Sequence, residues 1–334
     1  MPAHENPLRL GVIGCGPYWS TRMHLPAMQR VATAENVRYV AVCDLDKPAA
    51  ELYARQLGAE TVHTDAADML DRHALDGVVI VVNVPTTPAM IELAATRRIP
   101  FLVEKPPASS VEVHQRLIAV VGNLPHIVAY NRRHAPYIVQ AKTWTADQPI
   151  QAVTGLFTRH RRLDPDFSTT AVHAIDTIRH LAGGDLATAR LDVVKTPTVF
   201  NYFLTGYTAA NTRVDLVVTP DTASAREHYT LSPADKNVAI AYPPPPMIDL
   251  PGYVEGHERN RNIRRLTPTS FGLAADVPPA LAGIVGEHTR FCGILRGRAR
   301  AISTLDTYLQ NQQIRQAITE LKQAEGGGIS MELE

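Results

Sequence analysis

Two glycines and an aspartate near the N-terminus have the types and spacing needed to hold a dinucleotide. Gly14 and Gly16 lie in the segment Gly11-Val-Ile-Gly-Cys-Gly16, directly after an apolar run. Glycines there permit a tight turn whose backbone amides approach a pyrophosphate. Asp44 directly follows the next apolar run, where a carboxylate can accept hydrogen bonds from the adenosine ribose hydroxyls. A plain glycine turn and an ordinary loop aspartate are the alternative interpretations.

The residue types around this motif also indicate which dinucleotide binds. The carboxylate of Asp44 would repel the extra phosphate of NADP, so we expect NAD, with NADP the less favoured cofactor. Trp19 occupies the third position of the fingerprint, where glycine is usual. The third glycine of the fingerprint normally lets the following helix pack closely on the first strand. With Trp19 at this position, other residues must provide that packing.

A lysine has the position required for proton transfer. Lys105, in Glu104-Lys-Pro106, follows the apolar run Phe101-Leu-Val103. The carboxyl ends of parallel strands face the ligand crevice, so a lysine there can reach a substrate oxygen. Partial burial and a nearby cation would lower its pKa towards a useful range. A surface lysine before a turn proline is the alternative.

Four polar residues recur along a second candidate segment. Thr169, His173, Asp176 and His180 are spaced by four, three and four residues, which places them along one face of a helix. His173 is the candidate proton donor or acceptor, and Asp176 is expected to orient its imidazole. The alternative is that His173 packs in the core while Asp176 pairs with Arg179 or His180.

Arginines supply candidate anion contacts, whereas no metal is expected. Arg159, in Arg159-His-Arg-Arg162, follows a predicted strand at 150–157 and presents forked donors to an anionic or polyhydroxylated substrate. A solvated strand end explains it equally well. Arg259, Arg261, Arg264 and Arg265 are interpreted as a loop surface or subunit contact. The thirteen histidines and three cysteines include no spacing typical of a zinc site.

The elements that position these residues alternate in the first third of the chain. Asp46 is expected to cap a helix that ends before Gly58. Ser109 and Glu112 have the spacing of a capping box and are expected to begin a helix that runs to Val121. Such alternation predicts a doubly wound parallel sheet. The predicted strands are 8–13, 37–43, 77–82, 101–103 and 126–129.

After residue 129 the pattern changes to strands that follow one another. A helix at 171–181 precedes predicted strands at 191–194, 199–204, 214–218, 228–231 and 238–241, which indicates an α+β domain with a large, mostly antiparallel open sheet. The segment 243–279 is interpreted as loop and 304–324 as helix. We therefore predict a dinucleotide-binding domain at 1–128, a substrate-binding and oligomerisation domain at 129–325 and a flexible tail at 326–334.

Composition excludes several classes of protein. The 334 residues contain 33 basic and 33 acidic side chains, so the net charge is zero and a nucleic-acid partner is not expected. Three cysteines cannot build a disulfide scaffold. No apolar run approaches the ~20 residues of a membrane span, and no secretion signal is evident. A cytoplasmic protein is the expectation.

Taken together, the motifs resemble those of a known family. Gly-Val-Ile-Gly-Cys-Gly at 11–16, Glu-Lys-Pro at 104–106, Tyr-Asn-Arg-Arg at 130–133 and His-Ala-Ile-Asp-x-x-x-x-Leu-Ala-Gly at 173–183 occur in order. The set resembles the glucose–fructose oxidoreductase, inositol dehydrogenase and rhizopine-catabolism (Gfo/Idh/MocA) family. The resemblance implies an N-terminal Rossmann domain, a C-terminal open-faced sheet and NAD(P)-dependent redox chemistry on sugars or polyols.

The resemblance also implies the site residues. It places Lys105 and His173 beside the nicotinamide and the substrate as catalytic residues. The candidate cofactor-binding residues are Gly14, Cys15, Gly16, Tyr18, Trp19, Asp44, Asn83, Pro85, Glu104, Lys105 and Asn131. The candidate substrate-binding residues are Lys105, Arg159, Thr169, His173 and Asp176.

Departures from the family pattern leave alternatives open. Thr169 stands where the family often has an aspartate, and Val84-Pro-Thr86 stands where it usually has Thr-Pro-Asn. We predict an oxidoreductase that transfers hydride between nicotinamide and a hydroxyl or carbonyl carbon of a sugar, polyol or related small molecule. A dinucleotide-binding sensor or assembly protein without turnover, and a redox-assisted glycosidase with tightly bound NAD, are the alternatives. An open sheet face predicts a homodimer or homotetramer.

Overall fold

The protein consists of two compact units, which are described separately below. The computed structural model describes residues 6–16, 18–164, 166–243, 252–259, 261–273 and 278–333. The first unit comprises Met1–Asn131 and Gly283–Leu309, and the second comprises Arg132–Ala282 and Gln310–Glu334. The first boundary lies close to the predicted one at 128. The sequence-based division missed that residues 283–309 return to the first unit.

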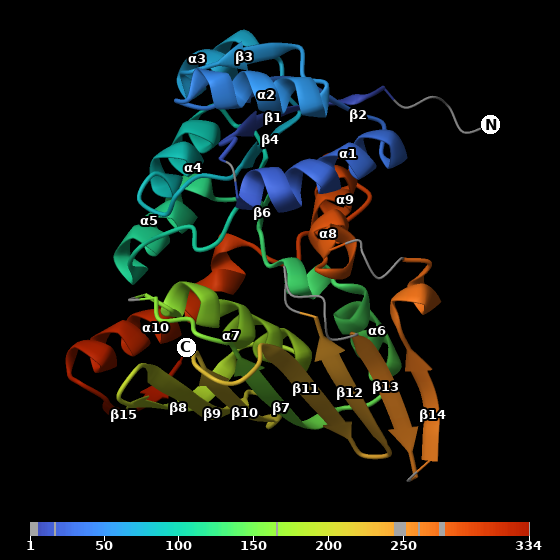
Figure 1. Ribbon diagram of the computed structural model, residues 1–334, viewed down its shortest axis with the longest axis vertical. Helices are drawn as coiled ribbons and strands as arrows, with labels where there is room; N and C mark the ends of the chain where they lie inside the picture. Colours follow the sequence, from blue (N-terminus) through green and yellow to red (C-terminus); the bar gives the residue numbers. More distant parts are fainter. Residues whose placement is uncertain are drawn as a thin grey trace. The chain divides into compact units, whose positions relative to one another are not determined.

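A six-stranded parallel sheet forms the centre of the first unit (Figure 1). Its order is β3-β2-β1-β4-β5-β6, so the strand order reverses beside β1. In such doubly wound sheets the ligand crevice lies at this reversal, at the carboxyl ends of the strands. The predicted Rossmann-type sheet is confirmed. The strands are β1 (Leu8–Ile13), β2 (Val37–Cys43), β3 (Thr61–His63), β4 (Gly77–Ile80), β5 (Phe101–Val103) and β6 (His126–Val128).

Helix ends in this unit follow from local capping. Asp46 accepts a hydrogen bond from the amide of Ala49 and begins α2, which ends at Gly58 in a left-handed conformation, as predicted. Ser110, not the predicted Ser109, caps α5. The helical elements are η1 (Ser20–His24), α1 (Leu25–Ala34), α2 (Lys47–Leu57), α3 (Ala66–Arg72), α4 (Thr87–Thr96), α5 (Val111–Val121) and α9 (Ile284–Leu295).

The helix α9, from late in the sequence, completes the core of the first unit. Phe291 and Cys292 are buried in the same apolar cluster as Leu10 and Val12 of the central strand. A Cβ atom at Gly77 would lie 2.9 Å from the ring of Phe291, so β4 begins with a glycine that makes room for this ring. The first unit is therefore assembled from two segments that lie far apart in the sequence.

The second unit is built on a nine-stranded sheet. Its order is β14-β13-β12-β11-β7-β10-β9-β8-β15, and β7 and β10 form the parallel pair among otherwise antiparallel neighbours in the described sheet. This confirms the predicted large, mostly antiparallel sheet. The strands are β7 (Ile150–Thr158), β8 (Leu186–Lys195), β9 (Phe200–Thr208), β10 (Arg213–Thr219), β11 (Arg226–Pro233), β12 (Lys236–Tyr242), β13 (Tyr253–Glu258), β14 (Arg261–Leu266) and β15 (Gly327–Glu332).

Helices cover one face of this sheet. In Figure 1, α6 (Pro136–Trp144) and α7 (Ser168–Ala182) lie along it. Ala171 and Ile175 of α7 pack with Leu204 and Leu216 of the sheet. Alternate residues of β9, β10 and β11 are buried, as expected for strands with one covered face. The remaining elements are η2 (Asn131–His134), η3 (Pro268–Phe271), α8 (Pro278–Leu281) and α10 (Leu305–Gln323).

Two predictions for the C-terminal half are wrong. The segment 243–279 was interpreted as loop, but it contains β13 and β14; the prolines at 244–246 lie outside the described residues. The arginines at 261, 264 and 265 therefore belong to a strand. Residues 326–334 were predicted to form a flexible tail, but Gly327 to Glu332 form strand β15, which pairs with β8. The predicted helix at 304–324 is confirmed as α10.

None of the helices in the described part of the chain combines the length and apolar character of a membrane-spanning segment.

Candidate active site

The turn after β1 requires glycine at its first position. Gly14 has φ +97°, and a Cβ atom there would lie 2.1 Å from the carbonyl oxygen of Val81. Its amide donates to the carbonyl of Cys43 at 2.8 Å, which ties the turn to the end of β2. At Gly16 no described atom lies within 4 Å of the position a Cβ would take. The second glycine therefore leaves open space, as close approach of a pyrophosphate requires.

Asp44 is fixed by two backbone amides. The amide of Cys15 donates to Oδ2 at 2.6 Å, and the amide of Asp46 donates to Oδ1 at 3.0 Å. An ionised carboxylate has about four acceptor positions, so each oxygen can still accept from a ribose hydroxyl. Cys15 contributes its backbone, because burial raises the pKa of its thiol to about 12.

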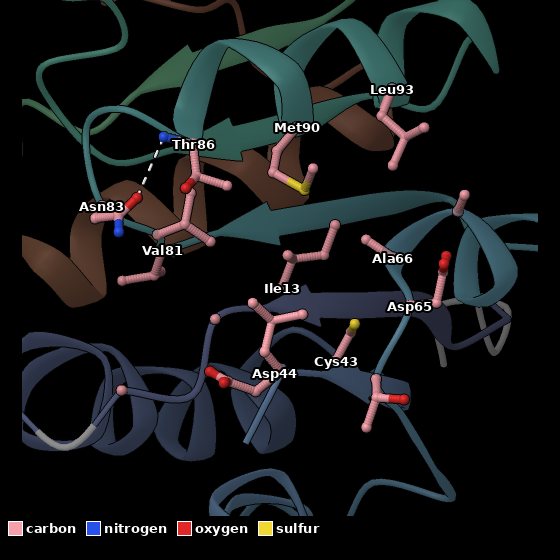
Figure 2. A pocket seen from close by; sticks show the side chains of 16 residues that line it. Ile13, Cys43, Asp44, Asp65, Ala66, Val81, Asn83, Thr86, Met90 and Leu93 are labelled. Carbon is pink, nitrogen blue, oxygen red and sulfur yellow. Dashed lines mark hydrogen bonds between the residues drawn. The ribbon is translucent and has the colours of Figure 1, made fainter. Parts of the chain in front are cut away.

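A cavity of about 530 Å³ lies at the carboxyl ends of β1, β2 and β4, within the first unit (Figure 2). Asp44 and Asp65 lie at its polar edge. Its apolar wall includes Ile13, Val81, Met90 and Leu93. Apolar walls with a few fixed polar groups are typical of nucleotide sites, in which a flat base packs between side chains.

The sequence predicted only part of this cavity. Asn83, a candidate cofactor-binding residue, lines it, and its side chain accepts from the amide of Thr86 at 3.2 Å at the start of α4. Pro85 is exposed in the same turn. Asp65, Met90 and Leu93 were missed. Asp65 follows the short strand β3, which the sequence pattern did not reveal, and it also caps α3.

Trp19, which stands in place of the third glycine, makes a hydrogen bond to a residue 85 positions later. Its indole Nε1 donates to Oε1 of Glu104 at 2.6 Å, which joins the glycine turn to the end of β5. The Ser20 hydroxyl donates to the carbonyl of Gly14 at 2.8 Å, so the first helical turn is held to the strand directly. Tyr18 is exposed, with Arg22 over its ring.

Glu104 is a buried acceptor that fixes the strand end carrying Lys105. It accepts from His24 Nε2 at 2.9 Å and from the backbone amide of Lys105 at 2.9 Å, in addition to Trp19. Burial raises the pKa of Glu104, but the hydrogen bond and charge of His24 and the charge of Lys105 outweigh it, and the net pKa is lowered. These three partners of Glu104 are all protein groups. Lys105 itself is half-buried.

The predicted helix of the second unit is confirmed as α7. His173 is buried in its middle, and Thr169 lies half-buried one turn earlier on the same face. The Thr169 hydroxyl donates to the carbonyl of Asp166 at 2.9 Å, and the Thr177 hydroxyl to that of His173 at 2.7 Å. Lys105 belongs to the first unit and His173 to the second. Asn131 is buried at the start of η2.

Asp176 is held by an arginine and an asparagine of the second unit. It is fully buried, and its carboxylate accepts from Arg133 Nε at 2.9 Å and Nη2 at 2.6 Å and from Asn311 at 2.9 Å. A bidentate arginine pair of this kind is a strong structural contact. The carboxylate of Asp176 is thus bound by Arg133 and Asn311, and its charge also acts on Arg179, one of the two pairing partners expected as alternatives.

Arg159 is likewise held by the protein. It is buried and ion-paired with Glu227, which also accepts two hydrogen bonds of 2.7 Å from Arg132. Burial raises the pKa of Glu227, but the two guanidinium groups outweigh it, and the net pKa is lowered. Two cations share one anion, so this cluster carries one excess positive charge. The guanidinium of Arg159, predicted to contact substrate directly, pairs with Glu227 and stacks on the ring of Phe157.

Comparison with known proteins identifies the first unit. Residues 8–132 match the model of the oxidoreductase family with the NAD-binding Rossmann fold, GFO_IDH_MocA. The chain is 32% identical over 129 residues to D-apiose dehydrogenase of Paraburkholderia graminis, covering 38% of this chain and 33% of that protein. It is 30% identical over 195 residues to inositol 2-dehydrogenase 2 of Saccharopolyspora erythraea, covering 54% and 56%.

Solved structures share the fold over nearly the whole chain. A dehydrogenase from Chromobacterium violaceum has a TM-score of 0.83 at 17% identity, covering 96% of this chain and 98% of that one. Levoglucosan dehydrogenase, in complex with NADH and levoglucosan, has a TM-score of 0.78 at 18% identity, covering 97% and 99%.

The family resemblance expected from the motifs is confirmed. Residues 8–132 match the NAD-binding domain of the Gfo/Idh/MocA oxidoreductase family. Its second unit continues with the fold seen in the structures above. The matched segments span one third to about half the length of the first two curated relatives.

Proposed function

We propose that this protein is an NAD-dependent oxidoreductase that transfers hydride between nicotinamide and a hydroxyl or carbonyl carbon of a sugar, polyol or related small molecule. The observation that carries the proposal is the carboxylate of Asp44, fixed by two backbone amides beside the glycine turn. Lys105 lies at the end of β5 in the same sheet, and the dehydrogenases named above support the reaction class.

The residues of the first unit fit NAD. Gly14 has no room for a side chain, and Gly16 leaves open the space that a pyrophosphate needs. Asp44 retains acceptor capacity for ribose hydroxyls, and Asp65 adds a second carboxylate to the same cavity. Both carboxylates oppose an additional phosphate, so NAD is preferred over NADP.

The proposed chemistry divides between cofactor and protein. When bound, NAD supplies the hydride acceptor for oxidation. Lys105 takes the proton of the substrate hydroxyl, and in the reductive direction returns it to the developing alkoxide. His173 hydrogen-bonds the substrate. Thr169 carries no charge, so it cannot raise the pKa of His173 as an aspartate would, and Lys105 is the principal proton-transfer group.

The substrate class follows from the relatives and from the cluster of Arg132, Arg159 and Glu227. The relatives are named for apiose, inositol and levoglucosan, which are rich in hydroxyl groups. The excess positive charge of the cluster adds affinity for a substrate with a carboxylate or phosphate. A screen that compares neutral polyols with their acid counterparts, with NAD reduction followed at 340 nm, distinguishes a neutral substrate from an anionic one.

A second candidate function is dinucleotide binding without turnover. Thr169, where the family often has an aspartate, favours it. Turnover of added NAD or NADH with any member of the substrate panel excludes this candidate. Cleavage of a glycoside without net formation of NADH would instead identify the redox-assisted glycosidase.

We also propose a homodimer or homotetramer in which the uncovered face of the second sheet is buried. Side chains such as Leu156 and Tyr207 are 39% and 44% exposed there. Apolar groups on an open sheet face are commonly covered by a second subunit. Light scattering tests the assembly, and Leu156→Glu should weaken it.

A further inference from the structure

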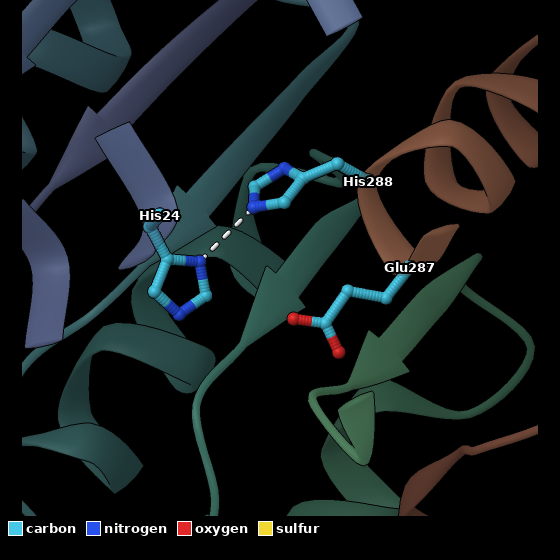
Figure 3. A group of neighbouring side chains, drawn as sticks. All are labelled: His24, Glu287 and His288. Carbon is cyan, nitrogen blue, oxygen red and sulfur yellow. Dashed lines mark hydrogen bonds between the residues drawn. The ribbon is translucent and has the colours of Figure 1, made fainter. Parts of the chain in front are cut away.

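Three potential metal ligands converge in the interior of the first unit. His24 ends η1, and Glu287 and His288 lie in the first turns of α9. All three are buried, and one ligand atom of each lies within 4.8 Å of the others. Figure 3 shows the two imidazoles facing each other, with the carboxylate of Glu287 beside them. None of these side chains is used in the proposed reaction.

The carboxylate of Glu287 is the observation that calls for a ligand. It is fully buried, and neither oxygen has a hydrogen-bond partner among the described residues. Burial and repulsion from Glu104 raise its pKa well above the usual value. An ionised carboxylate without partners costs several kcal/mol in such surroundings. The position therefore requires either a proton or a cation.

The two imidazoles are arranged as metal ligands usually are. Nε2 of His24 lies 2.9 Å from the carboxylate of Glu104, and Nδ1 lies 3.0 Å from Nε2 of His288. Because ionised Glu104 accepts the Nε2 proton, the lone pair of Nδ1 is directed at His288. A carboxylate that fixes a histidine from behind is the usual support of a metal-bound imidazole.

We propose that His24 Nδ1, His288 Nε2 and the carboxylate of Glu287 bind one zinc ion. Two imidazoles and one carboxylate are a zinc donor set. Charge also balances: two positive charges on the ion match one negative charge on Glu287 and one on Glu104. Zinc bonds of ~2.0–2.2 Å place tetrahedral ligands about 3.4 Å apart. Zinc binding would therefore turn the two imidazoles from each other towards the ion, widening their 3.0 Å separation, and would bring the Glu287 carboxylate to the same point.

Three protein ligands leave a fourth position on zinc, which a water molecule would fill. The ion would join α9 to η1 directly behind the end of β5, through Glu104. The sequence gives no zinc signature, because His24 and His288 are 264 positions apart. The proposal does not depend on the proposed oxidoreductase activity, since its test measures bound metal.

The competing arrangement is a metal-free network. In it Glu287 keeps its proton and one histidine donates to the other. The substitution Glu287→Gln separates the two, because an amide has the same shape without the charge. It replaces a protonated carboxyl at little cost, whereas it removes an anionic zinc ligand.

The experiment uses the full chain produced in zinc-supplemented medium, with metal measured by mass spectrometry after gel filtration. We expect about one zinc per wild-type chain and less than one tenth of that for Glu287→Gln. His73→Gln is the matched control, because His63 and His73 form another close histidine pair, 2.9 Å apart, near the surface of the same unit. It should retain the wild-type zinc content.

Thermal unfolding provides a second readout. Chelator treatment should lower the midpoint of the wild type and of His73→Gln but leave Glu287→Gln unchanged, because an ion bound only to the folded state stabilises it. Wild-type protein without stoichiometric zinc, or Glu287→Gln with wild-type zinc content, would overturn the proposal in favour of the metal-free network.

Discussion

Replacing Asp44 with serine should change the preference between the two nicotinamide dinucleotides. Each hydrogen bond from a ribose hydroxyl to a fixed carboxylate contributes about 1.5–3 kcal/mol. Serine can still accept one, so NADH should bind about 10–100-fold more weakly to the variant. NADPH should bind as well as before or better, because the repulsion that disfavours its phosphate at a few ångströms, up to ~4 kcal/mol, is removed.

The same substitution has a cost in stability that must be measured separately. The amides of Cys15 and Asp46 lose their acceptor, which costs about 1–3 kcal/mol for each group left without a partner. Asp44→Asn retains an acceptor oxygen and loses only the charge. Asp46→Asn is the matched control, because Asp46 caps α2 and does not line the cavity.

Fluorescence titration of wild type and variants with NADH and NADPH is the assay, with unfolding midpoints measured on the same preparations. Wild type should bind NADH roughly 100-fold more tightly than NADPH. Asp46→Asn should keep this ratio. Equal or reversed affinities in the wild type would refute the assignment of Asp44 as the ribose-binding group.

Four further changes test other parts of the structure. Lys105→Ala should leave NADH binding intact and lower kcat by about 100-fold or more in the 340 nm assay; wild-type turnover would show that another group transfers the proton. His173→Asn should raise KM and preserve the main ionisation of the pH–rate profile; loss of that ionisation would reverse the two roles. Gly14→Ala should destabilise the fold in urea unfolding by ~3 kcal/mol or more, because a Cβ would contact a backbone oxygen at 2.1 Å; an unchanged midpoint would contradict the turn geometry. Glu227→Gln should cost about 3–5 kcal/mol near pH 7. Because folding lowers the pKa of this carboxyl, its stabilisation is complete above the ordinary glutamate pKa and is lost as the pH falls through the lowered pKa, so the difference in stability between wild type and variant should shrink on acidification; a constant difference would exclude the ion pair as the cause.

Local patterns predicted the framework of the first unit. Asp46, Gly58 and the apolar runs that became β1, β2, β4 and β5 act through neighbours in sequence, so their types and spacing were sufficient. The same holds for α7, whose periodicity placed Thr169 and His173 on one face. The position of Asp44 after β2 was predictable for the same reason.

Contacts between distant segments were not predictable in this way. Asp176 had the right helical spacing to serve His173, but Arg133, 43 positions earlier, binds it. The glycines at 326–328 indicated flexibility, yet Gly327 and Gly328 are the first residues of β15 and pair with β8. Whether a buried charge serves substrate or another side chain depends on such partners, which a single sequence does not reveal.

The late helix α9 has a consequence for how the first unit is made on the ribosome. Strands β1–β6 are complete by residue 128, but Phe291 and Cys292, which belong to their core, are synthesised about 160 residues later. At 5–20 residues per second this is a delay of ~8–30 s. During that interval the apolar surface that receives α9, including the space beside Gly77, stays uncovered. The nascent chain is thus exposed to misassembly and chaperone binding until residues 132–282 of the second unit have been translated.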